Sequence, residues 1–259
     1  MKRILSFSFF VFLVCNSAFG WGREGHEVIA KIAENNLKTT VRNKIEQYLG
    51  NHSIVYYAKW MDDYRHTPEY KFTHKWHVAN VDENLVYVPD YEVGDAIIGI
   101  EQAVSTLRDY KELSDSTVAV NIKYLVHLVA DMHCPGHIYY KGRNQNFTVN
   151  FGGGYVKPEI KTKIHSVWDQ YAIQATRIWS VSEYANELDR VSSKEKTIMS
   201  SGTPVDWLHD NAQRCLFQFE IAIPDQKLAQ DFVNEAMPLL ETQMLYAGYR
   251  LAALLNSLF

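Results

Sequence analysis

Apolar side chains recur every three or four positions along most of this chain, which is the spacing of one face of an α-helix. The pattern fills residues 28–37, 41–49, 97–107 and 232–255. Residues 118–132 are strongly apolar and Pro135 follows them, so they predict a buried central helix that ends before this proline. We therefore expect an all-α fold, a single domain of packed helices with long loops.

A further helix, one strand and three loops complete the predicted elements. Residues 160–174 follow Pro158 and predict a helix, while residues 147–151 give the best strand pattern before a run of glycines. The stretches 51–80, 139–158 and 180–206 are expected to be loops, where binding and catalytic residues are often found.

The first residues have the layout of a cleavable signal peptide. Lys2 and Arg3 precede an apolar run at 4–14, and Ala18 and Gly20 are small residues that suit a cut after Gly20. The apolar run is too short to span a membrane as a stable helix.

The chain is thus expected to consist of a signal peptide at 1–20 and one domain at 21–259. No second apolar span follows the first, so we expect a secreted or periplasmic protein without stable membrane insertion after cleavage. An uncleaved anchor and lipid attachment at Cys15 remain alternatives. The sequence does not give the oligomeric state, and we favour a monomer.

The formal net charge is −4, and the signal region contributes only basic residues, so the remaining domain is more acidic still. A negative protein repels nucleic acid and phosphate, which argues against a basic-patch binder. Bound divalent cations reverse the potential locally, so the charge does not exclude a metal-dependent phosphoesterase.

Cysteine is sparse. Outside the signal region only Cys134 and Cys215 remain, and their spacing does not resemble a zinc finger. One disulfide between them and two free thiols are both left open.

The central predicted helix carries polar side chains within an apolar segment. His127 and Asp131 are four residues apart and share one helix face, and His137 follows the helix break. A buried carboxylate needs a partner or a metal ion, because burying an unpaired charge is costly. A plain His–Asp hydrogen bond in a core is the alternative.

The same His-x-x-x-Asp spacing returns at His165 and Asp169 on the next predicted helix. Burying one such His–Asp pair without a ligand would be costly, and the sequence has two of them on apolar helices. The repetition therefore favours bound metal that both pairs share. Imidazole and carboxylate suit zinc.

Two more segments offer ligands. In the loop at 51–80, Asp62 and His77 are candidates, with Asp63 and His74 as local competitors; an ordinary polar loop is the alternative.

If cleavage exposes Trp21, its amino group and carbonyl oxygen can chelate a metal, and His26 can add a ligand. A flexible terminus with one exposed histidine is the alternative here.

Taken together, these segments resemble the secreted zinc-dependent single-strand-specific nucleases and 3′-nucleotidases, which share the fold of bacterial zinc phospholipase C. The resemblance covers nearly the whole chain after residue 20. It runs through Trp21-Gly-x-x-Gly-His26, Trp60-x-Asp62-x-Tyr64-Arg65, His127-x-x-x-Asp131-Met-x-x-Pro-x-His137 and His165-Ser-x-Trp-Asp169.

The resemblance implies three zinc ions as cofactors. The first would be held by Asp62, His77, His127 and Asp131, the second by His137, His165 and Asp169, and the third by Trp21, His26 and Asp131. Asp131 would bridge the first and third ions.

The resemblance also implies a hydrolase of ester bonds that converts single-stranded DNA or RNA to 5′-nucleotides and removes 3′-phosphate from nucleotides. Zinc-bound hydroxide would attack phosphorus, with Asp62 and Asp131 in the catalytic centre. Arg65 would either pair with phosphate oxygens or form a salt bridge to Asp62 or Asp63. Asn80 is the candidate for a contact to the base, although the family has an acidic residue there.

Other functions remain open at this point. A zinc phospholipase C is the nearest alternative, although Asp169 as the last ligand favours the nuclease. A non-catalytic zinc-binding envelope protein and a metal-free helical interaction domain are the alternatives from other classes.

Overall fold

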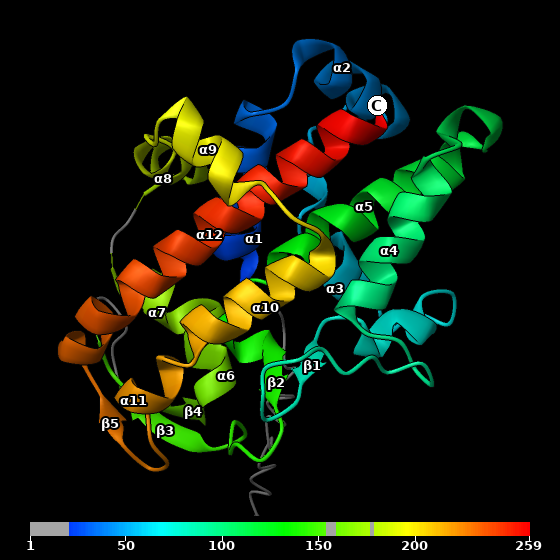
Figure 1. The fold of residues 1–259 in the computed structure, drawn as a ribbon. Coiled ribbons are helices and arrows are strands. Elements are labelled where there is room, and N and C mark those ends of the chain that lie inside the picture. The colour runs from blue at the N-terminus through cyan, green and yellow to red at the C-terminus, as the bar shows by residue number, and fades with distance from the viewer. Residues whose placement is uncertain (1–20, 154–158, 177–178) are drawn as a thin grey trace, which may run out of the picture.

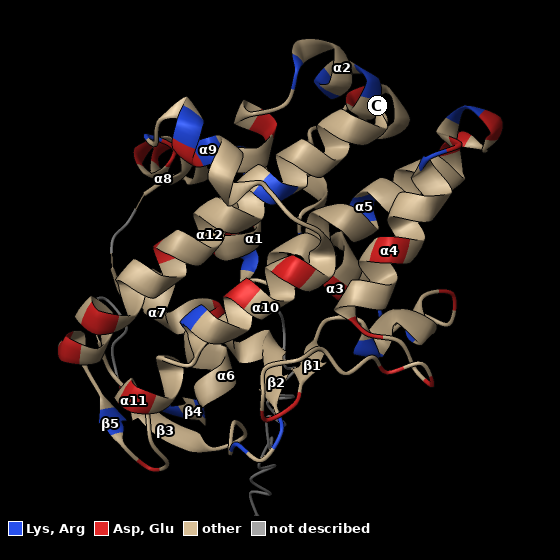
Figure 2. Cartoon of the chain, in the orientation of Figure 1, with Lys and Arg blue, Asp and Glu red and all other residues tan. Residues whose placement is uncertain are grey.

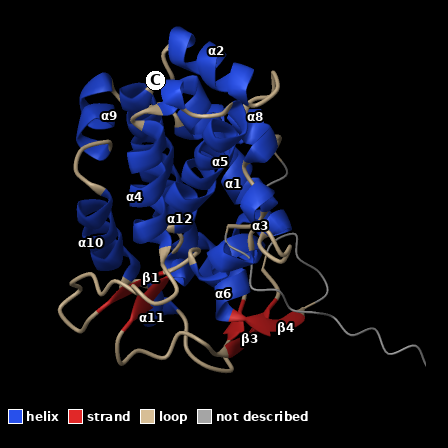
Figure 3. Ribbon diagram, turned by 90° about the vertical axis from the view of Figure 1, so that its right-hand side faces the viewer, coloured by secondary structure: helices blue, strands red, loops and turns tan. Residues whose placement is uncertain are grey.

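A computed structural model describes residues 21–153, 159–176 and 179–259 (Figure 1). The expected signal peptide at 1–20 lies outside the described residues. Within the described part, helices form most of the molecule and a few short strands gather at one end of it (Figure 3), so the predicted mainly helical fold is confirmed.

Three long helices organise the core: α1 (Arg23–Asn35), α5 (Asp115–Asp131) and α12 (Gln230–Leu258). They contribute to two clusters of buried apolar side chains, one around α4 (Ala96–Leu107) and one towards the strands. Gly248 of α12 lets this helix approach α1 closely, because a Cβ there would overlap the side chain of Ile32. The core therefore lies between these helices.

The buried helix predicted at 118–132 is α5. It begins where the Ser114 side chain accepts a hydrogen bond from the Thr117 amide, a typical N-cap. It ends at Asp131, a few residues before Pro135. The helices predicted from apolar spacing elsewhere correspond to α1, α2 (Thr39–Tyr48), α4 and α12.

Two short parallel strands connect distant parts of the chain. Strand β1 (Ala79–Val81) pairs with β2 (Ile138–Tyr140), with Asn80 opposite Tyr139. Each strand begins just after a candidate ligand, His77 in one case and His137 in the other. The pairing therefore brings these two histidines to the same place.

A second, three-stranded sheet lies nearby. Strand β3 (Thr148–Phe151) matches the predicted strand, and it lies between the antiparallel β4 (Ile160–Lys163) and the parallel β5 (Lys227–Leu228). The helix predicted at 160–174 is wrong in its first part, because residues 160–163 form β4 by backbone pairing with β3. The rest is α6 (Ile164–Ser166), a π-helical turn η5 (Val167–Tyr171) and α7 (Ala172–Gln174).

The loop predicted at 180–206 is also wrong. This stretch contains α8 (Val181–Leu188), α9 (Ser193–Met199) and the start of α10 (Pro204–Cys215), which is followed by α11 (Gln218–Ile221). Reciprocal capping boxes open the three helices, between Ser180 and Glu183, Ser192 and Glu195, and Thr203 and Asp206. These polar residues start helices and do not mark a loop.

The stretch 51–80 is a series of short helical turns: η1 (Ile54–Tyr57), α3 (Trp60–Tyr64) and η2 (Lys71–Lys75). The remaining 3₁₀ turns are η3 (Tyr110–Glu112) and η4 (Pro135–His137). Cys134 and Cys215 are both buried and free, so the disulfide alternative is wrong. Among the described residues, no helix combines the length and apolar character needed to cross a membrane.

Candidate metal centre

Four of the predicted ligands gather around the carboxylate of a fifth, Asp131, at the end of α5. Asp131 Oδ2 lies 2.8 Å from His77 Nδ1 and 3.0 Å from His127 Nε2. Asp62, from α3, places its Oδ1 3.8 Å from each of the same two ring nitrogens. We call Asp62, His77, His127, Asp131 and His26 the inner cluster, and all five side chains are buried.

The other oxygen of Asp131 faces different partners. Asp131 Oδ1 lies 3.4 Å from His26 Nε2, and the His26 ring stacks on that of His127 with 4.1 Å between centroids. The two oxygens of one carboxylate thus face imidazoles from different segments of the chain: His26 from α1 on one side, and His127 from α5 with His77 from the turn after η2 on the other. This arrangement suits a carboxylate that bridges two cations.

Several buried polar atoms of the inner cluster lack a hydrogen-bond partner. They are both ring nitrogens of His26, both carboxylate oxygens of Asp62, Nε2 of His77 and Oδ1 of Asp131. Buried polar groups without partners are rare and costly, so each calls for an explanation. Metal ions bound among these atoms would supply the missing partners, and the donor set of imidazole and carboxylate fits zinc.

Backbone carbonyls orient two of the histidines. Nδ1 of His127 donates to the Ala58 carbonyl at 2.9 Å, and Nδ1 of His137 donates to the His77 carbonyl at 2.6 Å. Each bond fixes the ring and leaves Nε2 free to ligate, which is the usual support of metal-binding histidines.

A second group of ligands, the outer cluster, consists of His137, His165 and Asp169. His137 Nε2 and His165 Nε2 are 3.1 Å apart, and His165 Nε2 lies 2.9 Å from Asp169 Oδ2. Asp169 Oδ1 is 3.5 Å from His137 Nε2. The structure therefore brings together the three side chains that the two sequence motifs offered separately.

The π-helical turn η5 holds Asp169, and it connects the outer cluster to the start of the domain. The Gly22 amide donates to the Asp169 carbonyl at 2.6 Å. The Trp21 indole donates to the Ala130 carbonyl at 2.8 Å, and its side chain is fully buried. Trp21 is thus anchored beside Asp131, while its role as a main-chain metal ligand stays a prediction.

Burial and neighbouring charges act oppositely on the histidines. Burial lowers the pKa of His26, and it lowers the pKa of His77 to about 4. Burial also disfavours the charged form of His137, but Asp131 and Asp169 outweigh it and raise this pKa to about 9. His127 and His137 in turn outweigh the burial of Asp131 and hold its pKa well below the usual range. Asp131 is therefore ionised and able to bind a cation.

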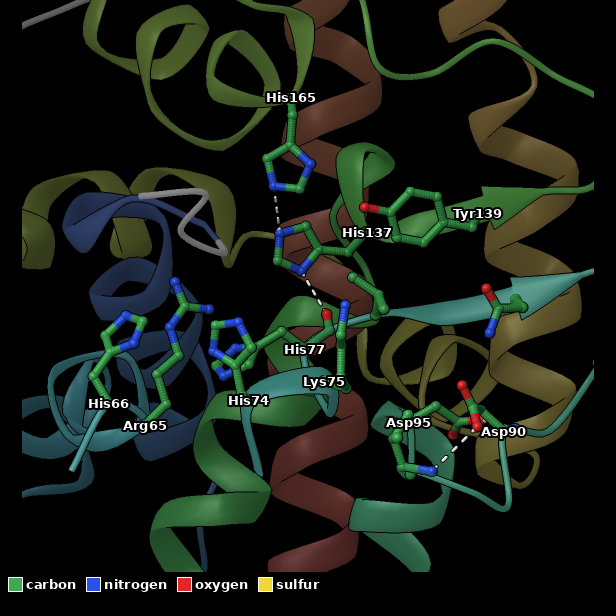
Figure 4. Close-up of a pocket in the computed structure, with 14 residues that line it drawn as sticks. Arg65, His66, His74, Lys75, His77, Asp90, Asp95, His137, Tyr139 and His165 are labelled. Atoms are coloured by element: carbon green, nitrogen blue, oxygen red, sulfur yellow. Dashed lines mark hydrogen bonds between the residues drawn. The ribbon is translucent and has the colours of Figure 1, made fainter. Parts of the chain in front are cut away.

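The outer cluster opens into a cavity of about 630 Å³, and His77 of the inner cluster also lines it (Figure 4). Arg65 lines the same cavity and keeps its Nη1 3.5 Å from Asp62 Oδ1. Both interpretations of Arg65 are therefore compatible: it pairs with Asp62 and it reaches the cavity. Asn80 lines the cavity too, while its contact to a base stays a prediction.

The competing ligands are not in either cluster. Asp63 is exposed and pairs with Lys59 at 2.8 Å. His74 lines the cavity but belongs to none of the ligand groups formed by the described residues.

Sequence reasoning gave no ligand role to Cys134 and did not identify Tyr139 at this site. The thiol of Cys134 lies 3.1 Å from Asp169 Oδ1, and it forms a potential metal-binding group with His137 and Asp169. Its position three residues before His137 was the available signal. Tyr139 lines the cavity through its pairing with β1, which the sequence pattern does not reveal.

Comparison with known proteins identifies the family to which this chain is related. The family model described as S1/P1 Nuclease matches residues 21–259. The chain is 25% identical to Nuclease S1 of Aspergillus oryzae, across 99% of this chain and 98% of that protein. It is 23% identical to Endonuclease 4 of Arabidopsis thaliana, across 94% and 91% of the two chains. It is 25% identical to Nuclease P1 of Penicillium citrinum, across 92% and 97%.

Proposed function

Because the chain belongs to the S1/P1 nuclease family, we propose that it is a zinc-dependent hydrolase of phosphate esters. Its substrates are single-stranded DNA or RNA, which it converts to 5′-nucleotides, and nucleotides from which it removes 3′-phosphate. The names of its relatives, Nuclease S1 and Nuclease P1 among them, support a nucleic-acid substrate.

One observation carries the proposal: two adjoining clusters of imidazoles and carboxylates border one cavity large enough for a nucleotide. The His77 carbonyl accepts the Nδ1 hydrogen of His137, so the clusters are directly connected. The inner cluster leaves polar atoms without partners, and the outer cluster faces the cavity. A purely structural metal site would be closed on all sides, whereas a catalytic one keeps an open position.

Three zinc ions fit this donor set. We assign Asp62, His77, His127 and Asp131 to the first, and His137, His165 and Asp169 to the second. Trp21, through its amino group and carbonyl oxygen, joins His26 and Asp131 around the third.

The third assignment requires that Trp21 be the first residue of the mature protein. We therefore propose that residues 1–20 are a signal peptide and that the domain at 21–259 is exported.

Bound zinc lowers the pKa of a coordinated water from about 15.7 to near 7, and it stabilises negative charge on phosphate oxygens. Side chains of the protein supply the other contacts to the metal ions and the substrate. Asp131 keeps its negative charge at the inner cluster, and the guanidinium of Arg65 can donate to two phosphate oxygens from the cavity wall. The Asn80 amide can donate to or accept from a base edge.

The proposal is tested with protein that begins at Trp21, by measuring hydrolysis of single-stranded DNA with chelator, with zinc and with zinc after chelator. We expect cleavage that chelator stops and zinc restores, and no comparable cleavage of duplex DNA. Metal content measured on the same samples gives the number of ions.

Folded, zinc-loaded protein that leaves single-stranded DNA and 3′-nucleotides intact would overturn the proposal. Hydrolysis of a phospholipid by that sample would identify a phospholipase C instead. Bound zinc without any hydrolysis would indicate a non-catalytic zinc protein, and a chain that binds no zinc would indicate a helical interaction domain.

A further inference from the structure

A second hollow, of about 530 Å³, adjoins the metal cavity, and Arg65 is the one predicted site residue among its lining side chains. Arg65, His66, His74, Lys75 and Val93 line both spaces, so the two lie directly beside each other. Figure 4 shows Arg65, His66 and His74 together on the side of the cavity away from Tyr139. We call the second hollow the side groove.

The side groove is positively charged in an acidic protein. Lys71 and Lys75 join Arg65 along its wall, against one lining acid, Glu92, whereas the whole chain has a formal charge of −4. Among the residues that the structure describes, no carboxylate lies within ion-pairing distance of Lys71 or Lys75. Their charge therefore remains available to an anion.

The pKa of His74 is sensitive to the positive charges that surround it. Its partial burial lowers its pKa, and the charges of Arg65, His66, Lys75 and Lys71 lower it further. Cations from different turns of the chain thus act on one point of the groove. Such a concentration of like charge repels itself and favours a phosphate among these residues.

The 3₁₀ turn η2 fixes the position of the two lysines in the side groove. Lys71 and Lys75 are the first and last residues of η2, whose central Thr73 is buried and donates from Oγ1 to the Tyr70 carbonyl. The turn ends two residues before His77 of the inner cluster. The position of the lysines is therefore tied to that of the metal centre.

Phe72 adds an apolar surface to this charged groove. Its side chain is 59% exposed, and its ring meets the buried Trp76 edge-on, with 5.4 Å between centroids. A single exposed aromatic residue is ordinary on a protein surface. An exposed aromatic ring among lysines beside a phosphodiester-cleaving site is the combination that binds single-stranded nucleic acid.

We propose that the side groove binds a nucleotide adjacent to the one being hydrolysed, with its phosphate held by Lys71 and Lys75 and its base stacked on Phe72. This inference rests on the proposed nuclease function and extends it. It assigns recognition of a polynucleotide, as distinct from a mononucleotide, to residues outside the metal centre.

The test compares a 3′-phosphorylated mononucleotide, which occupies only the metal cavity, with a single-stranded oligonucleotide, which also reaches the side groove. The variants are Phe72→Ala and Lys71→Gln, because Lys75 also lines the metal cavity, whereas Phe72 and Lys71 line only the side groove. Their matched controls lie on α9, where Ile198 is also 59% exposed and Lys194 is exposed: Ile198→Ala and Lys194→Gln. All of these side chains are exposed, so each variant is expected to fold.

We expect Phe72→Ala to raise KM for the oligonucleotide by about five-fold or more, since stacking of one base on an aromatic ring has an effect of roughly that size or larger. Lys71→Gln should reduce the slope of log affinity against log salt concentration by about 0.7, the value for one lost phosphate contact. For the mononucleotide, kcat/KM should change less than two-fold. The control variants should match the unaltered protein on both substrates.

Oligonucleotide KM and salt slope that stay unchanged in both variants would overturn the inference and leave the nuclease function intact. Equal losses on both substrates would overturn it as well, because they would place these residues in the metal cavity. Unaltered protein that cleaves neither substrate would overturn both proposals together.

Discussion

The inner and outer clusters use the same kinds of ligand, but they are built differently. His26, Asp62 and His127 of the inner cluster come from three helices, and their side chains are entirely inaccessible to solvent. In the outer cluster, His165 keeps 17% of its side chain exposed and lines the cavity. The first cluster lies within the core, whereas the second is buried except for His165, which faces the cavity.

Because of this difference in burial, we expect the inner cluster to serve mainly stability and the outer cluster mainly turnover. A metal ion in the inner cluster would neutralise charge that the core otherwise buries without compensation, so it should contribute most to folding. An ion in the outer cluster would have room for water and substrate, so it should contribute most to turnover. Asp131 connects the two clusters, because its carboxylate contacts His26, His77 and His127 of the inner cluster and also lies 3.4 Å from His137 Nδ1 of the outer cluster.

The largest effect is expected from Asp131→Asn, which removes the charge shared by the inner cluster. We expect kcat/KM to fall by more than 100-fold, beyond the roughly 10- to 100-fold typical of residues that only support metal ligands. The bound zinc, measured by atomic spectroscopy, should fall by at least one ion. Asp63→Asn, an exposed neighbour in sequence of Asp62, is the control and should change neither quantity. A variant with full activity and full zinc would refute the bridging role.

Next in size is the difference between His26→Ala and His165→Ala. Both should lose a metal ion and most activity. Loss of a site saturated at 1,000 times its Kd removes about 4 kcal/mol of stability, and His26→Ala also leaves a cavity in the core. His26→Ala should therefore lower the Tm in zinc-buffered solution clearly more than His165→Ala does. Equal losses of Tm would show that the inner cluster has no special structural role.

A smaller effect should follow from one glycine added before Trp21. The added residue displaces the amino group that we assign to the third ion, so the zinc count should fall by one and activity by about ten-fold, a loss comparable to that of a disturbed metal site. Removal of the glycine by an aminopeptidase should restore both. If the extended protein keeps three ions, the amino terminus is not a ligand.

The metal-free protein should show opposite pH effects in the two clusters. The folded pKa of His77 is about 4, below the ordinary value of 6.5, so its contribution to stability is lost as the pH falls from 6.5 to 4. The folded pKa of His137 is about 9, so its contribution is present below pH 6.5 and is lost as the pH rises towards 9.

Chemical unfolding of chelated protein at several pH values checks this prediction. His77→Gln should flatten the acid side of the stability profile, and His137→Gln should flatten the alkaline side. If either substitution flattens the other side, the assignment of these titrations is wrong.

The smallest effects should come from two glycine substitutions beside the clusters. A Cβ at Gly25, next to His26, would come within 2.8 Å of the Trp21 ring, so Gly25→Ala should destabilise the protein by about 1–3 kcal/mol. A Cβ at Gly136 would lie 3.4 Å from Asp169 Oδ1, an ordinary contact, so Gly136→Ala should change stability by less than about 0.5 kcal/mol. Thermal unfolding of the two variants measures both losses of stability. A larger loss for Gly136→Ala than for Gly25→Ala would refute the tight packing of the inner cluster.

The sequence by itself determined the long helices and the pairs of ligands that lie on them. Apolar spacing located α1, α4, α5 and α12, because a helix that buries one face must repeat apolar residues at its own period. The spacing of four residues placed His127 beside Asp131 on one α-helical face. His165 and Asp169 also meet at this spacing, although they lie on the short α6 and the π-helical turn η5. The capping boxes of α8, α9 and α10 were also present in the sequence, although the polar composition of that stretch obscured them.

Only the tertiary structure decided which ligands share a site and what lies around them. The pairing of β1 with β2 brings His77 to His137 from 60 positions away, and three-residue strands have too few side chains to show a period. The turn of residues 160–163 into β4 depends on the backbone of β3, not on local preference. The side groove exists because η2 folds against the metal cavity, which is a long-range packing that no short stretch of sequence encodes.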